Sequence, residues 1–454
     1  LNSYVTRGGG EIGIAQAVQA FAAGVEPTVE MNPILLKPKG DQVSQVVLLG
    51  RPYKDVPIRE YYQETDFLLQ KALESANYLL DHYDHLVIEG AGGAAEINLY
   101  DRDIANIRLA ESCDMPILLV ADIERGGVFA QIYGTLMLLP PAIRKRVVGI
   151  VINKFRGDPS IFEKGKCQIE ELAGVPVIGI LPWTEVRLPS EDSLSIADKN
   201  GTASPVRIAV IRLPRISNFT DFEPLERQSC VEYVTPGSSL SGFDCVIIPG
   251  TKNTVGDLKI LHESGASAEI HRARELGVPV IGICGGYQML GTRIEDDGIE
   301  SGSGTTEGLG LLDVVTYFRL YRKETVQVER DANPIPPILS RVGKVSGYEI
   351  HMGETRSGNV SEALRGDGAV SEDGLVIGTY MHGFFHNRGA VSALISYLYE
   401  KKGIVYDAPA SDEQDPYDQI ADHFSEHSDI ALILRCFPEK SPQAGKMKSG
   451  SGVP

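Results

Sequence analysis

The chain has 454 residues, which at roughly 150 residues per domain leaves room for two or three domains. Hydrophobic residues make up 43% of it, enough to build cores, so general disorder is excluded. The net charge is −18, no apolar run is long enough to span a bilayer, and the six cysteines are scattered without a C-x-x-C pair. These features argue against nucleic-acid and membrane partners and against disulfide, zinc or iron–sulfur scaffolds, and they favour a cytoplasmic location.

Short apolar runs alternate with helical or loop stretches along most of the chain. The predicted strands cover residues 46–49, 86–88, 117–120, 147–152, 177–180, 208–211, 246–248 and 278–283. Continuous apolar strands of this kind are typical of parallel sheets that are covered on both faces. The sequence therefore predicts an α/β protein with doubly wound domains.

The number of predicted strands is too large for one sheet, and the polar stretch 189–205 is the best place to divide them. We expect one domain over 1–190, a linker over 191–205 and a second domain over 206–408. A helix that docks onto one of the domains is expected within 409–434, where Ile420, Phe424 and Ala431 have helical spacing. The Gly/Ser/Lys-rich segment 435–454 is predicted to be a disordered tail.

Polar residues follow three predicted strands of the first domain. Glu89 precedes a glycine-rich loop that ends at Gly93, Asp122 ends the next strand, and Asn153 and Lys154 follow the third. Because the carboxyl ends of parallel strands meet at one edge, these residues predict a ligand crevice there. A carboxylate beside a loop that can approach phosphate closely suits a Mg²⁺–phosphate site, with Glu89 as the metal ligand.

This set resembles the ATP-dependent, carboxylate-activating domain of the dethiobiotin synthetase group. The resemblance implies that Glu96 and Asp122 lie near the transferred phosphate and that Asn153 and Lys154 bind the nucleotide. The P-loop of that group is absent, and the early cluster Gly8–Gly13 lacks its Lys and a preceding strand. Because the chain starts with Leu1, we expect the first strand and the P-loop to precede it. The chain as written would then be an incompetent synthetase that tends to associate through an unpaired sheet edge, so homo-oligomers are expected.

The strongest local signal is an apolar strand that runs into Gly282-Ile-Cys284-Gly-Gly286, followed by a helix-like segment. This is the cysteine counterpart of the nucleophile elbow, in which small flanking residues permit a strained strand-to-helix turn. The turn presents the sulfur at the positive end of the helix, where a thiolate is stabilised. Cys284 is therefore predicted to be a nucleophile.

A cysteine nucleophile needs a base and donors for an oxyanion. His382 follows an apolar strand and precedes Gly383, so it is the predicted base, and His351 is left as the alternative. The N–H groups of Gly250, after the strand 246–248, and of Gly285, after the nucleophile, are the predicted oxyanion donors.

The segments PGT, GICGGYQMLG and MHG, in this order, resemble a class I glutamine amidotransferase domain over about residues 206–402. The wider family places Glu two residues after the His, where this chain has Phe384. The subgroup that acts on corrinoids also lacks this acid. The resemblance therefore points to that subgroup and leaves the group that orients His382 unnamed.

The pairing of the two domains resembles the cobyric acid synthase family over residues 1 to about 434. The segments that carry the resemblance include LNSYVT, MNPILLKPKG, IEGAGGAAEINL, DIERGGVFA, INKFRGD, RISNFTDFEPL and GYEIHMG. The related cobyrinic acid a,c-diamide synthases have G-H-E-F-H in place of Gly347–His351. The resemblance implies ATP- and glutamine-dependent amidation of four carboxylates of adenosylcobyrinic acid a,c-diamide, with Mg²⁺, in cobalamin biosynthesis. It also implies a closed path for ammonia between the domains.

Polar residues in the N-terminal segments, Glu11, Gln16 and Asn32, could face the substrate, although surface residues would look the same. Arg215, Asn218 and Asp221 are expected at a domain interface rather than in a site. Two alternatives stay open: an amidoligase for another carboxylate, such as cobyrinic acid or a cell-wall peptide, and a non-catalytic binding protein that retains the fold.

Overall fold

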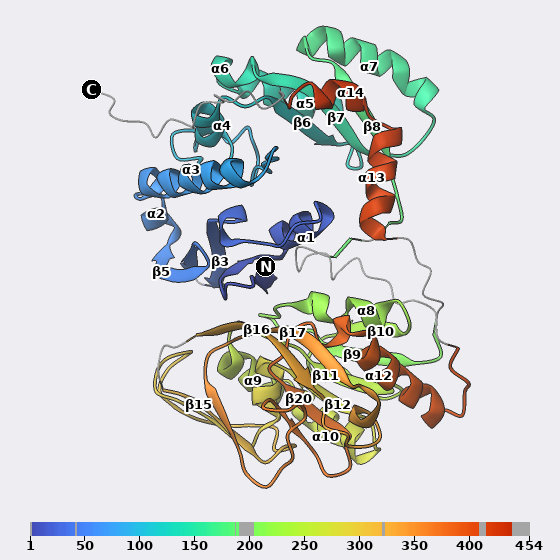
Figure 1. Ribbon diagram of the computed structural model, residues 1–454. Coiled ribbons are helices and arrows are strands. Elements are labelled where there is room, and N and C mark those ends of the chain that lie inside the picture. The colour runs from blue at the N-terminus through green and yellow to red at the C-terminus, as the bar shows by residue number, and fades with distance from the viewer. Residues whose placement is uncertain are drawn as a thin grey trace. The chain divides into compact units, whose positions relative to one another are not determined.

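The computed structural model describes residues 2–40, 43–186, 188–189, 204–319, 323–407 and 415–437. Contacts divide the chain into two compact units (Figure 1). Unit 1 contains residues 1–32, 49–51 and 189–411, and unit 2 contains residues 33–48, 52–188 and 412–454. The predicted linear boundaries stay a prediction, but these contacts group the first 32 residues with the second half of the chain.

The centre of unit 1 is a six-stranded sheet in the order β10-β9-β11-β12-β20-β19. Its first five strands are parallel, and β19 (Ala369–Val370) is antiparallel to β20 (Val376–Thr379). The others are β9 (Arg207–Ile211), β10 (Cys230–Val234), β11 (Cys245–Ile248) and β12 (Val280–Ile283). All residues of β11, β12 and β20 are buried, which fits strands that are apolar throughout.

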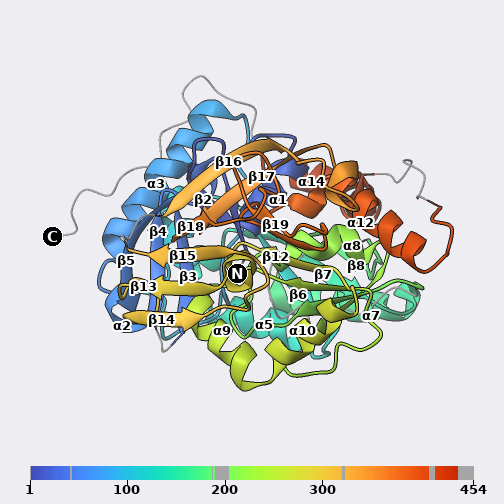
Figure 2. The same ribbon diagram turned by 90° about the horizontal axis from the view of Figure 1, so that it is seen from below.

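Helices and smaller sheets surround this sheet. The helices are α8 (Glu223–Glu226), α9 (Thr254–Glu263), α10 (Ala266–Glu275), α11 (Gly285–Leu290) and α12 (Arg388–Lys401). Figure 2 shows β13 (Arg293–Asp296), β14 (Gly304–Glu307) and β15 (Val314–Phe318) side by side, and β18 (Glu354–Ser357) completes their sheet. A long hairpin pairs β16 (Glu324–Asp331) with β17 (Lys344–His351).

The N-terminal residues form a small antiparallel pair, β1 (Ser3–Val5) with β2 (Glu11–Gly13), followed by α1 (Ile14–Ala22). Val5 and Ile12 are fully buried. Contacts of β1 with β16 and β17 account for the inclusion of this segment in unit 1.

Unit 2 is built around the parallel strands β6 (Ile117–Asp122), β7 (Val147–Phe155) and β8 (Val177–Pro182). Its helices are α2 (Ile58–Tyr61), α3 (Thr65–His82), α4 (Ile107–Cys113), α5 (Val128–Leu138), α6 (Pro141–Arg144) and α7 (Pro159–Ala173). A second sheet has the order β3-β4-β5, with β3 (Ile34–Gly40), β4 (Val43–Leu48) and β5 (Arg51–Pro57). The α/β class is therefore confirmed.

Two predicted strands differ from the structure. The run at 46–49 is found in β4, but β4 pairs antiparallel with β3 instead of joining a parallel sheet. The run at 86–88 forms no strand, and Val87 is 80% exposed. Because a strand is stabilised only by pairing along its backbone, an apolar run without a neighbouring strand does not become one.

The expected C-terminal helix is divided in two, α13 (Pro416–Glu426) and α14 (Ile430–Leu434). Between them Ser428 bridges Gly179 of β8, Ile180 N–H donates to His427 O (3.1 Å), and Asp429 N–H donates to Ile178 O (2.7 Å). The segment thus docks onto unit 2 by extending its parallel sheet, and this pairing explains the break. The predicted tail beyond residue 437, and the linker apart from residues 204 and 205, lie outside the described residues.

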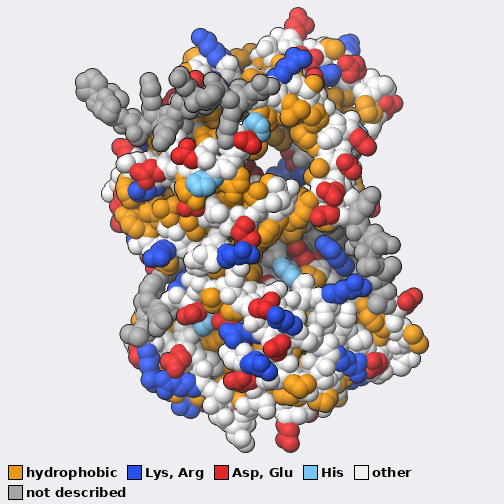
Figure 3. All heavy atoms as spheres, viewed as in Figure 1, with side chains coloured by type: hydrophobic (Ala, Val, Ile, Leu, Met, Phe, Trp, Pro, Cys, Tyr) orange, Lys and Arg blue, Asp and Glu red, His pale blue; other side chains and the backbone are white. Residues whose placement is uncertain are grey.

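Among the residues that the structure describes, no helix is long and apolar enough to cross a membrane. On the face in Figure 3, acidic and basic side chains are interspersed. The described cysteines are all free thiols.

Candidate active site

Cys284 lies at the turn between β12 and α11, with φ +51° and ψ −110°. A positive φ is a strained conformation for a non-glycine residue, and nucleophile elbows store strain of this kind. The turn leaves little space, because a Cβ on Gly286 would lie 2.0 Å from Ile248 O. Glycine at this position therefore lets α11 start directly against β11, and the sequence prediction of an elbow agrees with the geometry.

His382 follows β20, the neighbour of β12, and both its side chain and that of Asp221 are 2% exposed. Its Nδ1 lies 2.7 Å from Asp221 Oδ2. The second oxygen, Asp221 Oδ1, accepts a hydrogen bond from Gly383 N–H at 2.9 Å. One carboxylate therefore fixes both the imidazole ring and the backbone beside it.

The protonation of His382 depends on these neighbours. Burial by itself lowers the pKa of His382, but the Asp221 carboxylate and Cys284, which is within hydrogen-bonding reach, raise it, with a net value of about 10. An imidazolium beside a cysteine is the arrangement in which thiolate nucleophiles are found. The His382 side chain is thus placed to exchange a proton with the sulfur.

The loop after β11 lies against His382 and against the elbow residue Gly285. A Cβ on Gly250 would lie 3.0 Å from His382 Cε1, and a Cβ on Gly285 would lie 3.3 Å from Thr251 N. The Asp257 carboxylate holds this loop, since it accepts hydrogen bonds from Thr251 Oγ1 (2.5 Å) and from the Arg215 guanidinium (3.0 Å). Gly250 and Gly285, the predicted oxyanion donors, are therefore brought together at the elbow.

The order of the strands in the sheet brings the residues of the site together. Asp221, Gly250, Cys284 and His382 follow β9, β11, β12 and β20, which are consecutive neighbours in the parallel sheet. Ligand sites of open parallel sheets form at the carboxyl ends of the strands. The constellation therefore lies where this architecture places active sites.

His351, the alternative base, has different partners. Its ring stacks on Tyr380 with centroids 3.7 Å apart, its Nδ1 lies 3.3 Å from Gly353 O, and its Nε2 lies 3.7 Å from Glu349 Oε2. From the same strand, Ile350 reaches the predicted nucleophile, since its carbonyl oxygen lies 3.4 Å from Cys284 Sγ. The geometry therefore favours His382 over His351.

Asp221 is not among the predicted site residues, because the sequence predicts it, with Arg215 and Asn218, at a domain interface. A carboxylate between the buried residues Phe219 and Phe222 is a signal that could have been used. A buried carboxylate needs a charged or hydrogen-bonded partner, and the unassigned orienter of His382 needed an acid.

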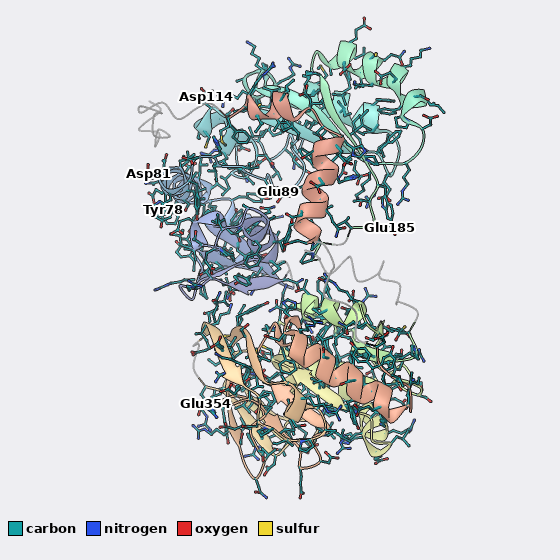
Figure 4. The ribbon with its side chains drawn as sticks, turned by 45° about the vertical axis from the view of Figure 1, so that its right-hand side comes forward. Tyr78, Asp81, Glu89, Asp114, Glu185 and Glu354 are labelled. Carbon is teal, nitrogen blue, oxygen red and sulfur yellow. The ribbon has the colours of Figure 1, made fainter. Side chains whose placement is uncertain are left out.

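In unit 2 the structure brings some predicted residues together. Lys154 Nζ lies 2.8 Å from Asp122 Oδ2, and this contact is the main cause of a lowered pKa of Asp122. Asn153 Oδ1 accepts the N–H of Lys154, which has a φ of +60°. Glu89 lies exposed on the connection between α3 and α4 (Figure 4), and the Glu96 carboxylate lies beside Gly93 of the glycine-rich loop. The roles of all these residues stay predictions.

The predicted substrate residues of the N-terminal segment lie in unit 1. Glu11 is fully buried and forms an ion pair with Lys323. Asn32 Oδ1 accepts the N–H of Gly13 at 2.9 Å, and Gln16 is half-buried on α1. Glu11 and Asn32 therefore make contacts within the unit, and the roles of all three residues toward the substrate stay predictions.

The fold of unit 1 and its Cys–His–Asp constellation define a glutamine amidotransferase of class I. Residues 207–390 match the model of a CobB/CobQ-like glutamine amidotransferase domain, and residues 44–188 match that of an AAA domain. A solved glutamine amidotransferase covers 43% of this chain and 99% of its own at 20% identity, with a TM-score of 0.31.

Curated relatives show which family of glutamine amidotransferases the chain belongs to. A protein of Methanosphaerula palustris, named probable cobyric acid synthase, is 61% identical over 98% of this chain and 91% of its own length. A protein of the same name from Methanoculleus marisnigri is 62% identical over 97% of this chain and 91% of its own. The chain belongs to the cobyric acid synthase family.

Proposed function

We propose that this protein amidates the b, d, e and g carboxylates of adenosylcobyrinic acid a,c-diamide, using glutamine and ATP, and releases adenosylcobyric acid in cobalamin biosynthesis. The observation that carries the proposal is the arrangement of Cys284, His382 and Asp221 in a chain whose relatives are cobyric acid synthases. Free cysteines and the use of ATP support a cytoplasmic reaction.

Unit 1 would carry out the glutamine hydrolysis. The Cys284 sulfur attacks the side-chain amide carbon of glutamine, and the oxyanion that forms is stabilised by the N–H groups of Gly250 and Gly285. The C–N bond breaks as His382 gives a proton to the leaving nitrogen, so ammonia departs and a thioester remains. Water then attacks the thioester while His382 takes its proton, which releases glutamate and restores the sulfur. Asp221 keeps the imidazole in one orientation throughout.

Unit 2 would activate the carboxylate that accepts the ammonia. A carboxylate reacts poorly with ammonia, so transfer of the ATP γ-phosphoryl group makes an acyl phosphate that ammonia attacks, with release of phosphate. Asn153 and Lys154, near the end of β7, would bind the nucleotide. Asp122, at the end of β6, and Glu96 would lie near the transferred phosphate.

Glu89 would hold the proposed magnesium ion together with the phosphates of ATP. Among the described residues, no group of three His, Cys, Asp or Glu side chains could hold a metal ion. This fits Mg²⁺, which usually binds one or two carboxylates and takes its other ligands from phosphates and water. When bound, it neutralises charge on the phosphates.

The test is product analysis. We expect the enzyme, prepared with the P-loop that its synthetase domain requires, to convert adenosylcobyrinic acid a,c-diamide with MgATP and glutamine into successive amidated corrinoids. These are separated by chromatography and identified by mass spectrometry. Cobyrinic acid and a cell-wall peptide carboxylate serve as competing substrates. Preferential amidation of either one would contradict the proposed substrate, and binding without ammonia release would indicate a non-catalytic protein.

A further inference from the structure

Ser3, near the start of the chain, lies between Tyr348, which stacks on the catalytic imidazole, and Asn218, which leads into the short helix of Asp221. Its N–H donates to Asn218 Oδ1 at 3.1 Å, and its carbonyl oxygen accepts the Tyr348 hydroxyl at 3.0 Å. All three residues are buried. We call Ser3, Asn218 and Tyr348 the Ser3 clamp. Both groups that Ser3 uses belong to the backbone, so the clamp depends on the position of β1 rather than on the serine side chain.

On one side of the clamp, Tyr348 fixes His382. The two rings are stacked, with centroids 5.5 Å apart and planes at 26°. The backbones are also paired, since Tyr348 N–H donates to His382 O (3.1 Å) and His382 N–H donates to Tyr348 O (2.8 Å). A Cβ on Gly347 would lie 2.2 Å from His382 O, so the glycine allows this close approach. Tyr348 therefore sets both the backbone and one ring face of His382.

On the other side, Asn218 leads into the short helix that carries Asp221. Asn218 has φ +52°, and its carbonyl oxygen accepts the N–H of Asp221 at 3.0 Å. The Asp221 carboxylate in turn holds Nδ1 of His382. The position of Asn218 therefore sets the carboxylate that orients the imidazole.

Strand β1 itself is held by the β16–β17 hairpin. Gln327 Nε2 of β16 donates to Tyr4 OH at 3.0 Å and to Val5 O at 2.9 Å. The Tyr4 ring meets that of Tyr348 edge-on, with centroids 5.5 Å apart. These contacts fix β1 against the same hairpin that carries Tyr348.

We propose that β1 is a working part of the glutamine-hydrolysing site. The backbone of Ser3 holds Asn218 and Tyr348 at a fixed separation, and through them it positions Asp221 and His382. The three clamp members are positioning residues, because none of them touches the reacting atoms. The inference rests on the proposed function only in that glutamine hydrolysis is the reaction of this site.

Two substitutions remove single hydrogen bonds of the clamp and keep the rest of each contact. Tyr348→Phe loses the bond to Ser3 but keeps the stacked ring, and Asn218→Gly loses the acceptor for Ser3 N–H but keeps a backbone that tolerates positive φ. We expect each to lower kcat for hydrolysis of glutamine alone by about tenfold, with KM changed by less than about twofold, because small misplacements of a catalytic group act mainly on kcat.

Further measurements separate positioning from stability. Tyr406→Phe is the matched control, since the Tyr406 hydroxyl donates a hydrogen bond to Gln228, which lies in the same unit and is not a site residue. This variant should keep the parental kcat. The rate of Cys284 alkylation by iodoacetamide against pH reports on the imidazole without turnover, and its profile should shift in both clamp variants. Because both act through Ser3, the double variant should lose much less than the product of the two single losses.

The outcomes distinguish the inference from its alternatives. If the clamp variants melt at lower temperature but keep the parental kcat and alkylation profile while folded, β1 is merely structural and the proposal is overturned. Fully multiplicative losses would overturn the role of Ser3 as the shared link. The assay contains no corrinoid, so a different amidation substrate would contradict the proposed function and leave this result intact.

Discussion

Nδ1 of His382 and Oδ2 of Asp221 lie 2.7 Å apart, although 161 positions separate them in the chain. The wider amidotransferase family carries its acid two residues after the histidine, and Phe384 occupies that position here. Phe384 is buried in the core. An acid that follows β9 therefore supplies the contact that the usual position cannot supply.

Replacement of this acid is the most direct test of its role. We expect Asp221→Asn to lower kcat for glutamine hydrolysis on the order of 10³-fold, because an amide can donate to Nδ1 and so favour the wrong tautomer of the imidazole. Amidation with ammonia as nitrogen source should be unchanged. Steady-state rates with each nitrogen source check this.

Asp244→Asn is the matched control for Asp221→Asn. Asp244 Oδ2 pairs with Lys402 Nζ at 2.7 Å in the same unit, away from the elbow. The control should keep the parental rate. Comparable losses in both variants would mean that any carboxylate of the unit matters, which would contradict a specific role of Asp221.

The pKa of His382 also predicts a pH dependence of stability. The folded value of about 10 lies above the ordinary 6.5, so folding favours the charged form. This contribution is complete below the ordinary pKa and is lost as pH rises through the folded pKa. We expect the difference in free energy of unfolding between the parent and Asp221→Asn to be largest below about pH 6.5 and to shrink towards pH 10.

Urea unfolding followed by far-UV circular dichroism measures this difference. Tryptophan fluorescence is unsuitable, since the one tryptophan, Trp183, lies in unit 2 and not in the unit that holds His382. A difference that grows from pH 6.5 to pH 10 would show that the carboxylate does not stabilise the imidazolium.

The elbow was predictable because its requirements are local. Glycines two residues before and after Cys284, an apolar strand and a following helix are all visible within one short segment. The positions of Gly250 and His382 at one edge of the sheet were predictable for a related reason, because each follows an apolar run and parallel strands place their carboxyl ends together.

The remaining site residues depend on contacts that no spacing rule reveals. Asp221 meets His382 only after the sheet has formed, and Ser3 acts through backbone groups that every residue possesses. The same limit explains the failed strand at 86–88, since an apolar run does not specify a pairing partner. Glu11 stays a predicted substrate residue, and its buried ion pair with Lys323 is likewise a contact that only the fold reveals.

Replacement of the predicted nucleophile, Cys284, is a second test of the glutamine-hydrolysing site. Cys284→Ala should abolish glutamine-dependent amidation, with a loss of roughly 10⁴-fold or more, since the thioester can no longer form. Ammonia-dependent amidation should persist because the second unit is untouched. Amidation of the corrinoid substrate is measured with glutamine and with ammonia. The control is Cys245→Ala, since Cys245 is buried on β11 outside the elbow. A near-parental rate of Cys284→Ala with glutamine would refute the assignment.

The metal site of the second unit gives the last prediction. In the enzyme with ATP, Glu89→Gln should leave glutamine hydrolysis largely intact and suppress product formation with either nitrogen source, because an amide replaces an anionic Mg²⁺ ligand poorly. Raising the Mg²⁺ concentration should recover part of the activity, since weaker binding is overcome by mass action. Glu171→Gln, an exposed carboxylate of α7 in the same unit, is the control and should show the parental Mg²⁺ dependence. If Glu89→Gln shows the same Mg²⁺ dependence as this control, Glu89 does not bind the metal, and the ligand must be sought among Glu96 and Asp122.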